Sequence, residues 1–521
     1  MPLQTAMLIP FHSGDGMARL FTAIVAAIAF TAAPAVAQTG AAQLSPQFDA
    51  IDGQFEAFQH DTPTPGLVYG IVAEGRLVHV RGFGVQDLTS RRPVTPDSLF
   101  RIASMTKAFT ALSILALRDA GKLSLDDLAE RHVPEMRSWT YPTADSPRIR
   151  IRDLLSHVAG FVTDDPWGDR QTPMPEAEFT RMLQAGVPFS RTPGMAHEYS
   201  NFGYALLGRI VANASGMPYR TYVERTILKP LGMSSSGFEV TEAPAERRAI
   251  GYRFEDGSWA EEPTMRHGAF GPMGGLQVSA NDYAKWIAFL LSAWPPRGGP
   301  ETGPVRRATV RELAQGLNFV RMTPRIGASA QGGCMQGTAY GKGLRVSQDC
   351  ELGMMLHHGG GYPGYGSHML LLPDAGVGIF VFTNRTYTGA SATAWDAMFA
   401  LNKAGALRFA EIPVSTDLAA AQDTARAIYR AGDVSVAGSR LAMNFLMDRS
   451  AAGWRRDLAA LRDQLGACDG AVEPLRPTGA LSGAFRWQCD KGALEGTLLL
   501  APTRPVTIQA LRFRPLPAAR P

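Results

Sequence analysis

Residues 101–110 of the 521-residue chain are RIASMTKAFT, and they contain its only Ser-x-x-Lys sequence, Ser104 with Lys107. Apolar residues recur at helical spacing from Phe109 onward, and Gly121 predicts where this helix ends. Residues three apart share one face of a helix, so the Lys107 amine lies within reach of the Ser104 hydroxyl. A serine hydroxyl becomes an effective nucleophile when a neighbouring base takes its proton, and a helix N-terminus favours a developing oxyanion. The stretch therefore predicts a nucleophile, its base and part of an oxyanion hole.

Two further short motifs carry side chains suited to the same chemistry. Residues 198–204 are EYSNFGY and include the only Tyr-x-Asn sequence, Tyr199 with Asn201. A phenol near a lysine ammonium loses its proton more easily and can act as a base or proton shuttle, and an amide can hold a substrate amide. Residues 358–365 are HGGGYPGY and follow a predicted strand, where a glycine run lets a substrate lie close to the strand edge.

Each motif has an ordinary structural explanation when it is taken alone. Ser-x-x-Lys occurs about once by chance in a chain of this size. A tyrosine such as Tyr199 is more often a packed aromatic residue, and a histidine such as His358 is more often structural. The functional argument rests on their order, in which a helix-start Ser-x-x-Lys precedes a loop Tyr-x-Asn and a strand-end His-x-Gly. The chain has no Gly-x-Ser-x-Gly sequence, which disfavours an α/β-hydrolase nucleophile.

Together the three motifs resemble those of the serine β-lactamase-like superfamily, which includes class C β-lactamases, DD-peptidases, D-aminopeptidases and family VIII esterases. The resemblance extends over roughly residues 45–400. Residues 151–157 are similar to the family's LLTH segment, residues 227–233 to its PLGM turn, and residues 274–282 to its GGLxSTxxDxAR helix start. The resemblance implies a mixed α/β (α+β) fold over residues 45–405, with an antiparallel sheet flanked by helices and a helical subdomain.

The resemblance also implies a role for each matching catalytic residue. Ser104 would be the acylated nucleophile. Lys107 would deprotonate it, alone or with Tyr199, and Tyr199 would relay a proton to the leaving group. Asn201 would hold the substrate amide. The backbone N–H groups of Ser104 and Gly361 would form the oxyanion hole.

The first four residues of the third motif would line the substrate site: His358, Gly359, Gly360 and Gly361. His358 stands where class C β-lactamases usually have a lysine, whereas a histidine occurs in DD-peptidase, aminopeptidase and esterase relatives. A mostly neutral imidazole suits an antibiotic carboxylate less well than a lysine does. The histidine therefore weakens the case for an efficient β-lactamase.

Local patterns predict the elements around the motifs. Residues 45–60 predict a helix, and the β-rich runs on either side of Glu74-Gly75 predict a hairpin. Ser279 predicts the N-cap of a helix. Residues 293–340 are rich in glycine and proline and are predicted to be an irregular loop. The later elements are predicted as strands at 354–358, 367–372 and 377–383 and a helix near 390–403.

The composition of the chain changes near residue 412. Helical patterns occupy residues 416–431 and 451–466, and three strand-like runs follow them. Residues 412–521 are therefore predicted to form a separate small α+β module. The order of its elements loosely resembles NTF2-like or cystatin-like folds.

The N-terminal residues have the pattern of a secretory signal. Arg19 precedes an apolar run over residues 20–30, and residues 35–37 are AVA, an A-x-A cleavage pattern. We expect a signal peptide over residues 1–37, with Met17 as a candidate start. The alternative, an uncleaved anchor, is disfavoured because the run is short for a membrane span. The mature protein is therefore expected to be periplasmic or secreted, without a stable membrane span.

The composition excludes some functions and predicts disulfides. Hydrophobic residues make up 45%, charged residues 19%, and the formal net charge is +4, with no dense basic run, so nucleic-acid binding has no support. The histidines are scattered, so neither a metal site nor a cofactor is predicted. The four cysteines form two local pairs, Cys334 with Cys350 and Cys468 with Cys489, which predict two bridges in an exported protein.

Other histidines and aromatic residues receive plainer interpretations. His157 is predicted to be a buried packing residue. His357, next to the motif histidine on a strand, is predicted to face the opposite side as a structural residue. Trp167, Tyr362 and Tyr365 are candidates to line the pocket.

The sequence leads to the hypothesis of an exported serine hydrolase that forms an acyl-enzyme with a small amide or ester. A D-amino-acid peptide or a carboxylic ester would be such a substrate. The alternatives are a β-lactamase, a catalytically silent protein that binds peptidoglycan fragments, and a scaffold role for residues 412–521. The natural substrate and the oligomeric state stay open.

Overall fold

The computed structural model describes residues 39–325, 334–469 and 474–516. The predicted signal peptide, residues 1–37, lies outside these ranges. Among the described residues, no helix combines the length and apolar character that a membrane crossing requires.

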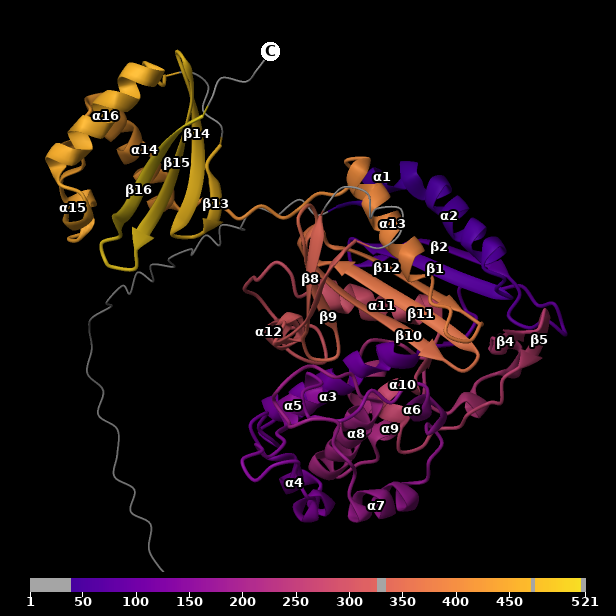
Figure 1. Cartoon of the computed structure of the whole chain (residues 1–521). Helices are drawn as coiled ribbons and strands as arrows, with labels where there is room; N and C mark the ends of the chain where they lie inside the picture. The colour runs from indigo at the N-terminus through magenta and orange to yellow at the C-terminus, as the bar shows by residue number, and fades with distance from the viewer. Residues whose placement is uncertain (1–38, 326–333, 470–473, 517–521) are drawn as a thin grey trace, which may run out of the picture. The chain divides into compact units, whose positions relative to one another are not determined.

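An eight-stranded antiparallel sheet runs through the part of the chain that carries the three motifs (Figure 1). Its strands are β1 (Gly66–Ala73), β2 (Arg76–Gly84), β7 (Asn318–Pro324), β8 (Met335–Tyr340), β9 (Arg345–Asp349), β10 (Gly353–Tyr362), β11 (Tyr365–Leu372) and β12 (Val377–Thr383). They lie in the order β2-β1-β12-β11-β10-β9-β8-β7. The predicted antiparallel sheet is therefore confirmed.

The first hairpin forms at the predicted turn. Glu74 and Gly75 join β1 to β2 with φ angles of 52° and 69°. Two positive φ angles in succession are typical of the tight turn that matches the twist of a hairpin. β1 is buried along its whole length because it pairs with both β2 and β12 and is covered on both faces.

Helices cover both faces of the sheet (Figure 1). α2 (Phe48–Asp61) and α13 (Ser391–Lys403) pack on one face, and α11 (Ala280–Leu291) packs on the other. Ser279 caps α11 as predicted, because its hydroxyl oxygen accepts the backbone N–H of Asp282. α1 (Ala41–Leu44) precedes α2.

A helical subdomain shares the hydrophobic core that lies on the α11 side of the sheet. Its helices are α3 (Thr106–Asp119), α4 (Ala129–His132), α5 (Ile151–Leu155), α6 (Trp167–Arg170), α7 (Glu176–Ala185), α8 (Asn201–Ser215), α9 (Tyr219–Val223) and α10 (Gly271–Gly274). Two short strand pairs lie nearby, β3 (Phe100–Arg101) with β6 (Gln277–Val278) and β4 (Tyr252–Glu255) with β5 (Ser258–Glu261). α3 is buried against α11, where Phe109 stacks on Trp286 with 3.8 Å between ring centroids. The predicted helical subdomain is confirmed.

The prediction of an irregular loop over residues 293–340 is wrong. This stretch contains α12 (Arg307–Arg311) and the strands β7 and β8, which extend the sheet beyond β9. None of the β7 residues is fully buried, so no apolar alternation marks the strand in the sequence. Pairing with β8 holds β7 in its extended conformation, and a local pattern does not reveal such pairing.

Both predicted disulfides are present, Cys334 with Cys350 and Cys468 with Cys489. The first bridge joins the residue before β8 to the residue after β9. It therefore ties together two adjacent strands at one end of the sheet.

The C-terminal residues form a small α+β module with its own hydrophobic core. Its elements are α14 (Thr416–Ala431), α15 (Phe445–Asp448), α16 (Ala451–Leu465), β13 (Arg476–Gly479), β14 (Ser482–Cys489), β15 (Gly492–Ala501) and β16 (Thr507–Leu516). The four strands are antiparallel and lie in sequence order. The predicted module is confirmed in its helices and strands, and its likeness to NTF2-like or cystatin-like folds stays a prediction.

Candidate active site

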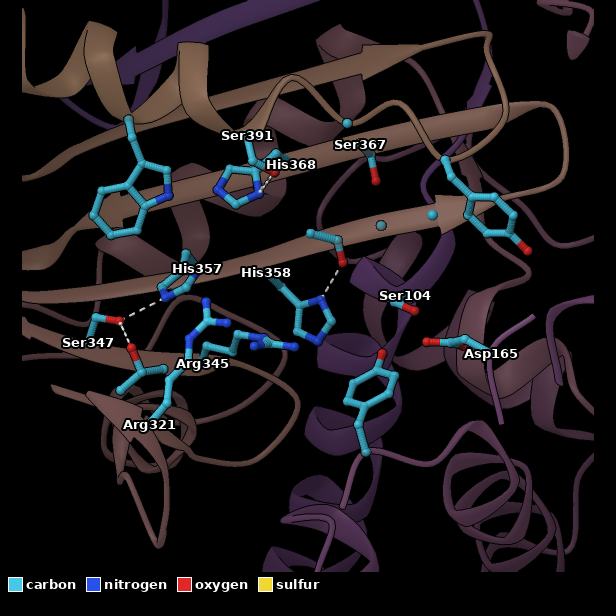
Figure 2. A pocket seen from close by; sticks show the side chains of 18 of the residues that line it. Ser104, Asp165, Arg321, Arg345, Ser347, His357, His358, Ser367, His368 and Ser391 are labelled. Carbon is cyan, nitrogen blue, oxygen red and sulfur yellow. Dashed lines mark hydrogen bonds between the residues drawn. The ribbon is translucent and has the colours of Figure 1, made fainter. Parts of the chain in front are cut away.

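Ser104 lies on a short 3-10 turn, Ala103–Met105, directly before α3. Ala103 has a φ of 49°, a left-handed conformation that is uncommon outside glycine. Backbone strain of this kind tends to occur where a fold holds a functional side chain in place. The turn presents the Ser104 side chain to a pocket with a cavity volume of about 570 Å³ (Figure 2).

Lys107 lies one turn further along and is fully buried beside Ser104. Its Nζ is 3.0 Å from Ser104 Oγ, 2.7 Å from Asn201 Oδ1 and 2.9 Å from the Met273 carbonyl oxygen. Burial lowers the pKa of Lys107 to about 8, although nearby carboxylates oppose this shift. A lysine with this pKa is partly neutral near neutral pH, so its amine can accept a proton from the hydroxyl it contacts.

The Tyr199 hydroxyl reaches the same nucleophile. Its side chain hydrogen-bonds Ser104, and Lys107 Nζ lies 4.8 Å from the centre of the Tyr199 ring. Burial raises the pKa of Tyr199 well above its usual value. This direction runs against the expectation that a nearby ammonium makes the phenol easier to deprotonate. The lowered pKa of Lys107 and the raised pKa of Tyr199 favour Lys107 as the base and Tyr199 as a neutral proton donor.

Asn201 begins α8 and is fully buried beneath the pocket. Its Oδ1 accepts from Lys107, and its Nδ2 donates to Asp165. Both ends of the amide are thus engaged within the protein, and Asn201 does not line the pocket. Asn201 therefore orients Lys107, and its expected contact with a substrate amide stays a prediction.

Three carboxylates near Asn201 were not singled out from the sequence. Asp164 accepts the backbone N–H of Asn201 at 2.6 Å and so helps to begin α8. Asp165 holds the Asn201 amide, and Asp169 accepts the hydroxyl of Tyr387 at 3.1 Å. Burial raises the pKa of Asp169 to about 7. The adjacent pair Asp164-Asp165 was the available signal in the sequence.

The glycine run of β10 forms the pocket edge opposite Ser104. The ladder between β9 and β10 ends at Arg345 and His357, so the following residues of β10 present an edge that β9 does not cover. A Cβ on Gly360 would overlap the carbonyl oxygen of Ile102, and one on Gly361 would lie 2.6 Å from the Tyr387 ring. Glycine at these positions lets β10 approach the nucleophile turn, and Gly359, Gly360 and Gly361 all line the pocket.

His358 is buried at the start of this edge. Its Nδ1 lies 2.6 Å from the Gly359 carbonyl oxygen, so Nδ1 donates and Nε2 accepts from the Tyr340 hydroxyl at 3.0 Å. Burial lowers the pKa of His358 well below its usual value, and the charges of Arg345 and Lys107 act in the same direction. The imidazole is therefore neutral at physiological pH.

The remaining expectations for single residues have mixed outcomes. His157 is buried and accepts the backbone N–H of Ser200 at Nδ1, so it is the packing residue that was expected. His357 faces away from His358, its Nε2 lies 2.9 Å from Ser347 Oγ, and it also lines a further part of the pocket.

The three aromatic residues expected to line the pocket do not do so. The Tyr362 hydroxyl accepts from Arg101, the Tyr365 hydroxyl donates to a backbone carbonyl, and Trp167 is half exposed against Phe270. Two other aromatic residues, Tyr387 and Trp395, line the pocket instead. Both follow β12 in the chain, so the fold rather than proximity to the motifs brings them there.

One group of metal-type ligands occurs among the described residues, Cys334 with Asp349 and Cys350. Both cysteines are joined in a disulfide, and Asp349 accepts two hydrogen bonds from Arg325. The sulfur atoms are therefore not available as thiolates.

Residues 51–403 match the model of the Beta-lactamase family. The chain belongs to this family. This family consists of serine hydrolases with the β-lactamase fold. The matched range includes all the residues that line the pocket. The superfamily resemblance of the three motifs is thereby confirmed.

Curated relatives in this family include a Protein flp and an esterase. Protein flp of Staphylococcus aureus (strain COL) is 29% identical over 326 residues, which are 61% of this chain and 59% of that protein. Esterase EstB of Burkholderia gladioli is 27% identical over 388 residues, which are 69% of this chain and 95% of that protein. The chain thus spans well under two thirds of Protein flp and almost all of the esterase.

Solved structures show the same fold. The octameric penicillin-binding protein homologue from Pyrococcus abyssi has a TM-score of 0.56 and 21% identity, and the match covers 88% of this chain and 91% of that one. A class C β-lactamase has a TM-score of 0.55 and 18% identity, and the match covers 69% of this chain and 97% of that one. The β-lactamase-like fold predicted for the larger domain is confirmed.

Proposed function

We propose that this protein is an exported serine hydrolase that cleaves a small ester or amide through an acyl-enzyme on Ser104. One observation carries the proposal. The side chains of Ser104, Lys107 and Tyr199, from two distant segments, converge at a pocket beside the open edge of β10. A nucleophile, a base of lowered pKa and a neutral proton donor are the groups that acyl transfer requires.

In the first step, neutral Lys107 takes the proton of Ser104 as the hydroxyl attacks the substrate carbonyl. The backbone N–H groups of Ser104 and Gly361 are the proposed donors to the oxyanion. Gly361 lines the pocket at the edge that the glycine run holds near Ser104. Collapse of the tetrahedral intermediate releases the leaving group, which Tyr199 protonates.

In the second step, water attacks the acyl-Ser104 ester. The first step leaves Tyr199 as a phenolate and Lys107 as an ammonium, so the phenolate takes a proton from the attacking water and the ammonium returns its proton to Ser104 Oγ. Tyr199 and Lys107 are the proposed carriers, because both contact Ser104.

An ester or a D-amino-acid peptide is the proposed substrate rather than a β-lactam. The full-length relative EstB, whose printed name is that of an esterase, supports an ester substrate. His358 is neutral, so it supplies no positive charge for the carboxylate of a β-lactam. A silent binding protein is the weaker alternative, because the pKa of Lys107 is already lowered toward that of a working base.

Export is part of the proposal. Two disulfides are present, and such bonds persist in oxidising compartments. Expression of the full chain in a Gram-negative host, followed by N-terminal analysis, tests the expected cleavage after residue 37. A periplasmic protein that begins at Gln38 supports export, and a cytoplasmic protein with an intact N-terminus contradicts it.

Turnover of a substrate panel tests the hydrolase. The purified protein and its Ser104→Ala variant are assayed with p-nitrophenyl acetate, a D-alanyl peptide and nitrocefin. The proposal expects hydrolysis of the ester or the peptide that is lost in Ser104→Ala. The proposal fails if the wild-type protein turns over neither, or if the variant retains full activity.

A further inference from the structure

The pocket continues around the edge of β10, away from Ser104. The residues that line this part, here called the rear recess, are Thr338, Ser347, His357, His368 and Ser391. Figure 2 shows Ser104 on one side of His358, with His357, His368 and Ser391 on the other. His357 and His358 are neighbours in β10 and face opposite sides of the sheet. The rear recess therefore lies on the side that α13 covers.

Hydrogen bonds fix the polar side chains of the rear recess. Thr338 Oγ1 lies 2.8 Å from Ser347 Oγ, which lies 2.9 Å from His357 Nε2. His368 Nδ1 lies 3.0 Å from Ser391 Oγ. All of these residues except Ser391 are more than nine-tenths buried, so the groups are held rigidly rather than exposed on a surface.

One imidazole nitrogen in the rear recess lacks a partner. His368 Nε2 is buried and makes no hydrogen bond to any described residue. Burial lowers the pKa of the His357 and His368 imidazoles, that of His368 to about 3, so both are neutral. When Ser391 donates to His368 Nδ1, the free Nε2 carries the proton of the neutral imidazole. A buried donor without a partner is costly, and a bound acceptor group would satisfy it.

The positive and the negative side chains of the pocket lie in different parts of it. Arg321 and Arg345 line it beside the rear recess, and neither pairs with a carboxylate of the described residues. The charges of both arginines act on His357. Asp165 lies on the other side of Ser104, and Figure 2 shows Ser104 between this carboxylate and the two arginines. A negative group is therefore favoured near the rear recess and repelled near Asp165.

The position of Tyr199 relates the rear recess to the reaction. Tyr199 is the proposed donor to the leaving group, and the guanidinium of Arg345 lies 6.0 Å from the centre of its ring. The leaving group therefore departs on the side where the arginines lie. A leaving group long enough to pass His358 would reach the rear recess.

We propose that the rear recess, with Arg321 at its rim, binds an oxyanion at the far end of the leaving group. The group is a carboxylate or a phosphate, because both offer several acceptor oxygens to guanidinium, hydroxyl and imidazole donors. A cation is disfavoured there because the charges of both arginines act on His357 in the rear recess. The inference rests on the proposed hydrolase function and adds a substrate class, esters or amides whose leaving group ends in an oxyanion.

Thioesters with leaving groups of graded length test the proposal. The substrates are S-acetyl mercapto acids with one to six methylene groups, their methyl esters, and the corresponding mercaptoalkyl phosphates, with thiol release as the readout. The wild-type protein is expected to show a kcat/KM about ten-fold higher for a free oxyanion than for the capped ester, with an optimum length. The carboxylate and phosphate series decide between the two oxyanions.

Matched variants locate the bound group. Arg321→Gln is expected to remove the preference, measured as the ratio of kcat/KM for the free and the capped substrate. Arg181→Gln, an exposed arginine of α7, is the control and should keep the preference. His368→Asn should weaken the preference through KM rather than kcat.

Three results would overturn the inference. They are equal rates for free and capped substrates in the wild-type protein, a preference that survives Arg321→Gln, and a preference that only Arg345→Gln removes. The last result would place the oxyanion at Arg345, near Tyr199, rather than at Arg321 and the rear recess. Hydrolysis of p-nitrophenyl acetate is a separate readout, so its failure would count against the hydrolase and not against the recess alone.

Discussion

The amide oxygen of Asn201 lies 2.7 Å from Lys107 Nζ, while the same ammonium nitrogen lies 3.0 Å from Ser104 Oγ. Asn201 therefore fixes the direction of the amine that is proposed to activate Ser104. Asp165 in turn accepts a hydrogen bond from Asn201 Nδ2. A flip of the Asn201 side-chain amide would therefore break both of these hydrogen bonds. The Tyr-x-Asn motif thus joins the proposed proton donor, Tyr199, to a residue that positions the proposed base, Lys107.

The activity should rise with pH as Lys107 loses its proton. Its pKa is lowered to about 8 by burial, and only the neutral amine can accept the Ser104 proton. The kcat/KM for a neutral ester is expected to increase from pH 6 and to level off above about pH 8. His358, whose pKa is lowered well below 6.5, should add no step between pH 6 and 8. A profile that falls over this range would contradict Lys107 as the base.

Asn201→Asp should move this profile to higher pH. A carboxylate beside Lys107 stabilises the ammonium form and raises its pKa, so the midpoint should rise by about one unit or more. At neutral pH the rate should fall about ten-fold and recover as the pH rises. Asn213→Asp, at an exposed site of α8, is the control and should leave the midpoint in place. An unchanged midpoint in Asn201→Asp would show that Asn201 does not act through Lys107.

Tyr199→Phe should lower kcat by about 10²–10⁴-fold, the usual contribution of a general acid or base. The loss should be largest for amides and smallest for p-nitrophenyl esters, because a poor leaving group needs a proton more. Tyr365→Phe removes a hydroxyl outside the pocket and should leave the rates near those of the wild type. Equal losses for good and poor leaving groups would argue against proton donation by Tyr199.

Gly360→Ala should damage the site by steric overlap. Its Cβ would meet the Ile102 carbonyl and the Ser367 hydroxyl, so β10 and the nucleophile turn must separate. Overpacking of this kind costs about 1–3 kcal/mol, and kcat should fall with the free energy of unfolding. Gly337→Ala in β8 has no atom within 4 Å of its new Cβ and serves as the control. Chemical denaturation and ester turnover measure both effects, and full activity in Gly360→Ala would show that close approach is unnecessary.

The sequence was most informative where local spacing decides the contact. The three-residue spacing of Ser104 and Lys107 was enough to place the amine against the hydroxyl. The turn at Glu74-Gly75 and the cap at Ser279 were likewise predictable from local chemistry. These features depend on neighbours in the chain, so one sequence contains the information.

The sequence was least informative where distant segments supply the environment. The sequence near Tyr199 did not predict that burial would raise its pKa, because the residues that bury its side chain come from other helices and strands. β7 and β8 were missed because their strand character depends on pairing, and with them Arg321 was missed as a pocket residue. The sequence does not show that the Asn201 amide contacts Lys107, because the two residues are far apart in the chain and only the fold brings them together.

Mass spectrometry of the trapped acyl-enzyme tests the central claim most directly. The protein is quenched in acid during turnover of an activated ester, digested and mapped. The account predicts one added acyl group on the peptide that contains Ser104, and none in Ser104→Ala. An acyl group on another residue, or turnover in Ser104→Ala at the wild-type rate, would contradict it.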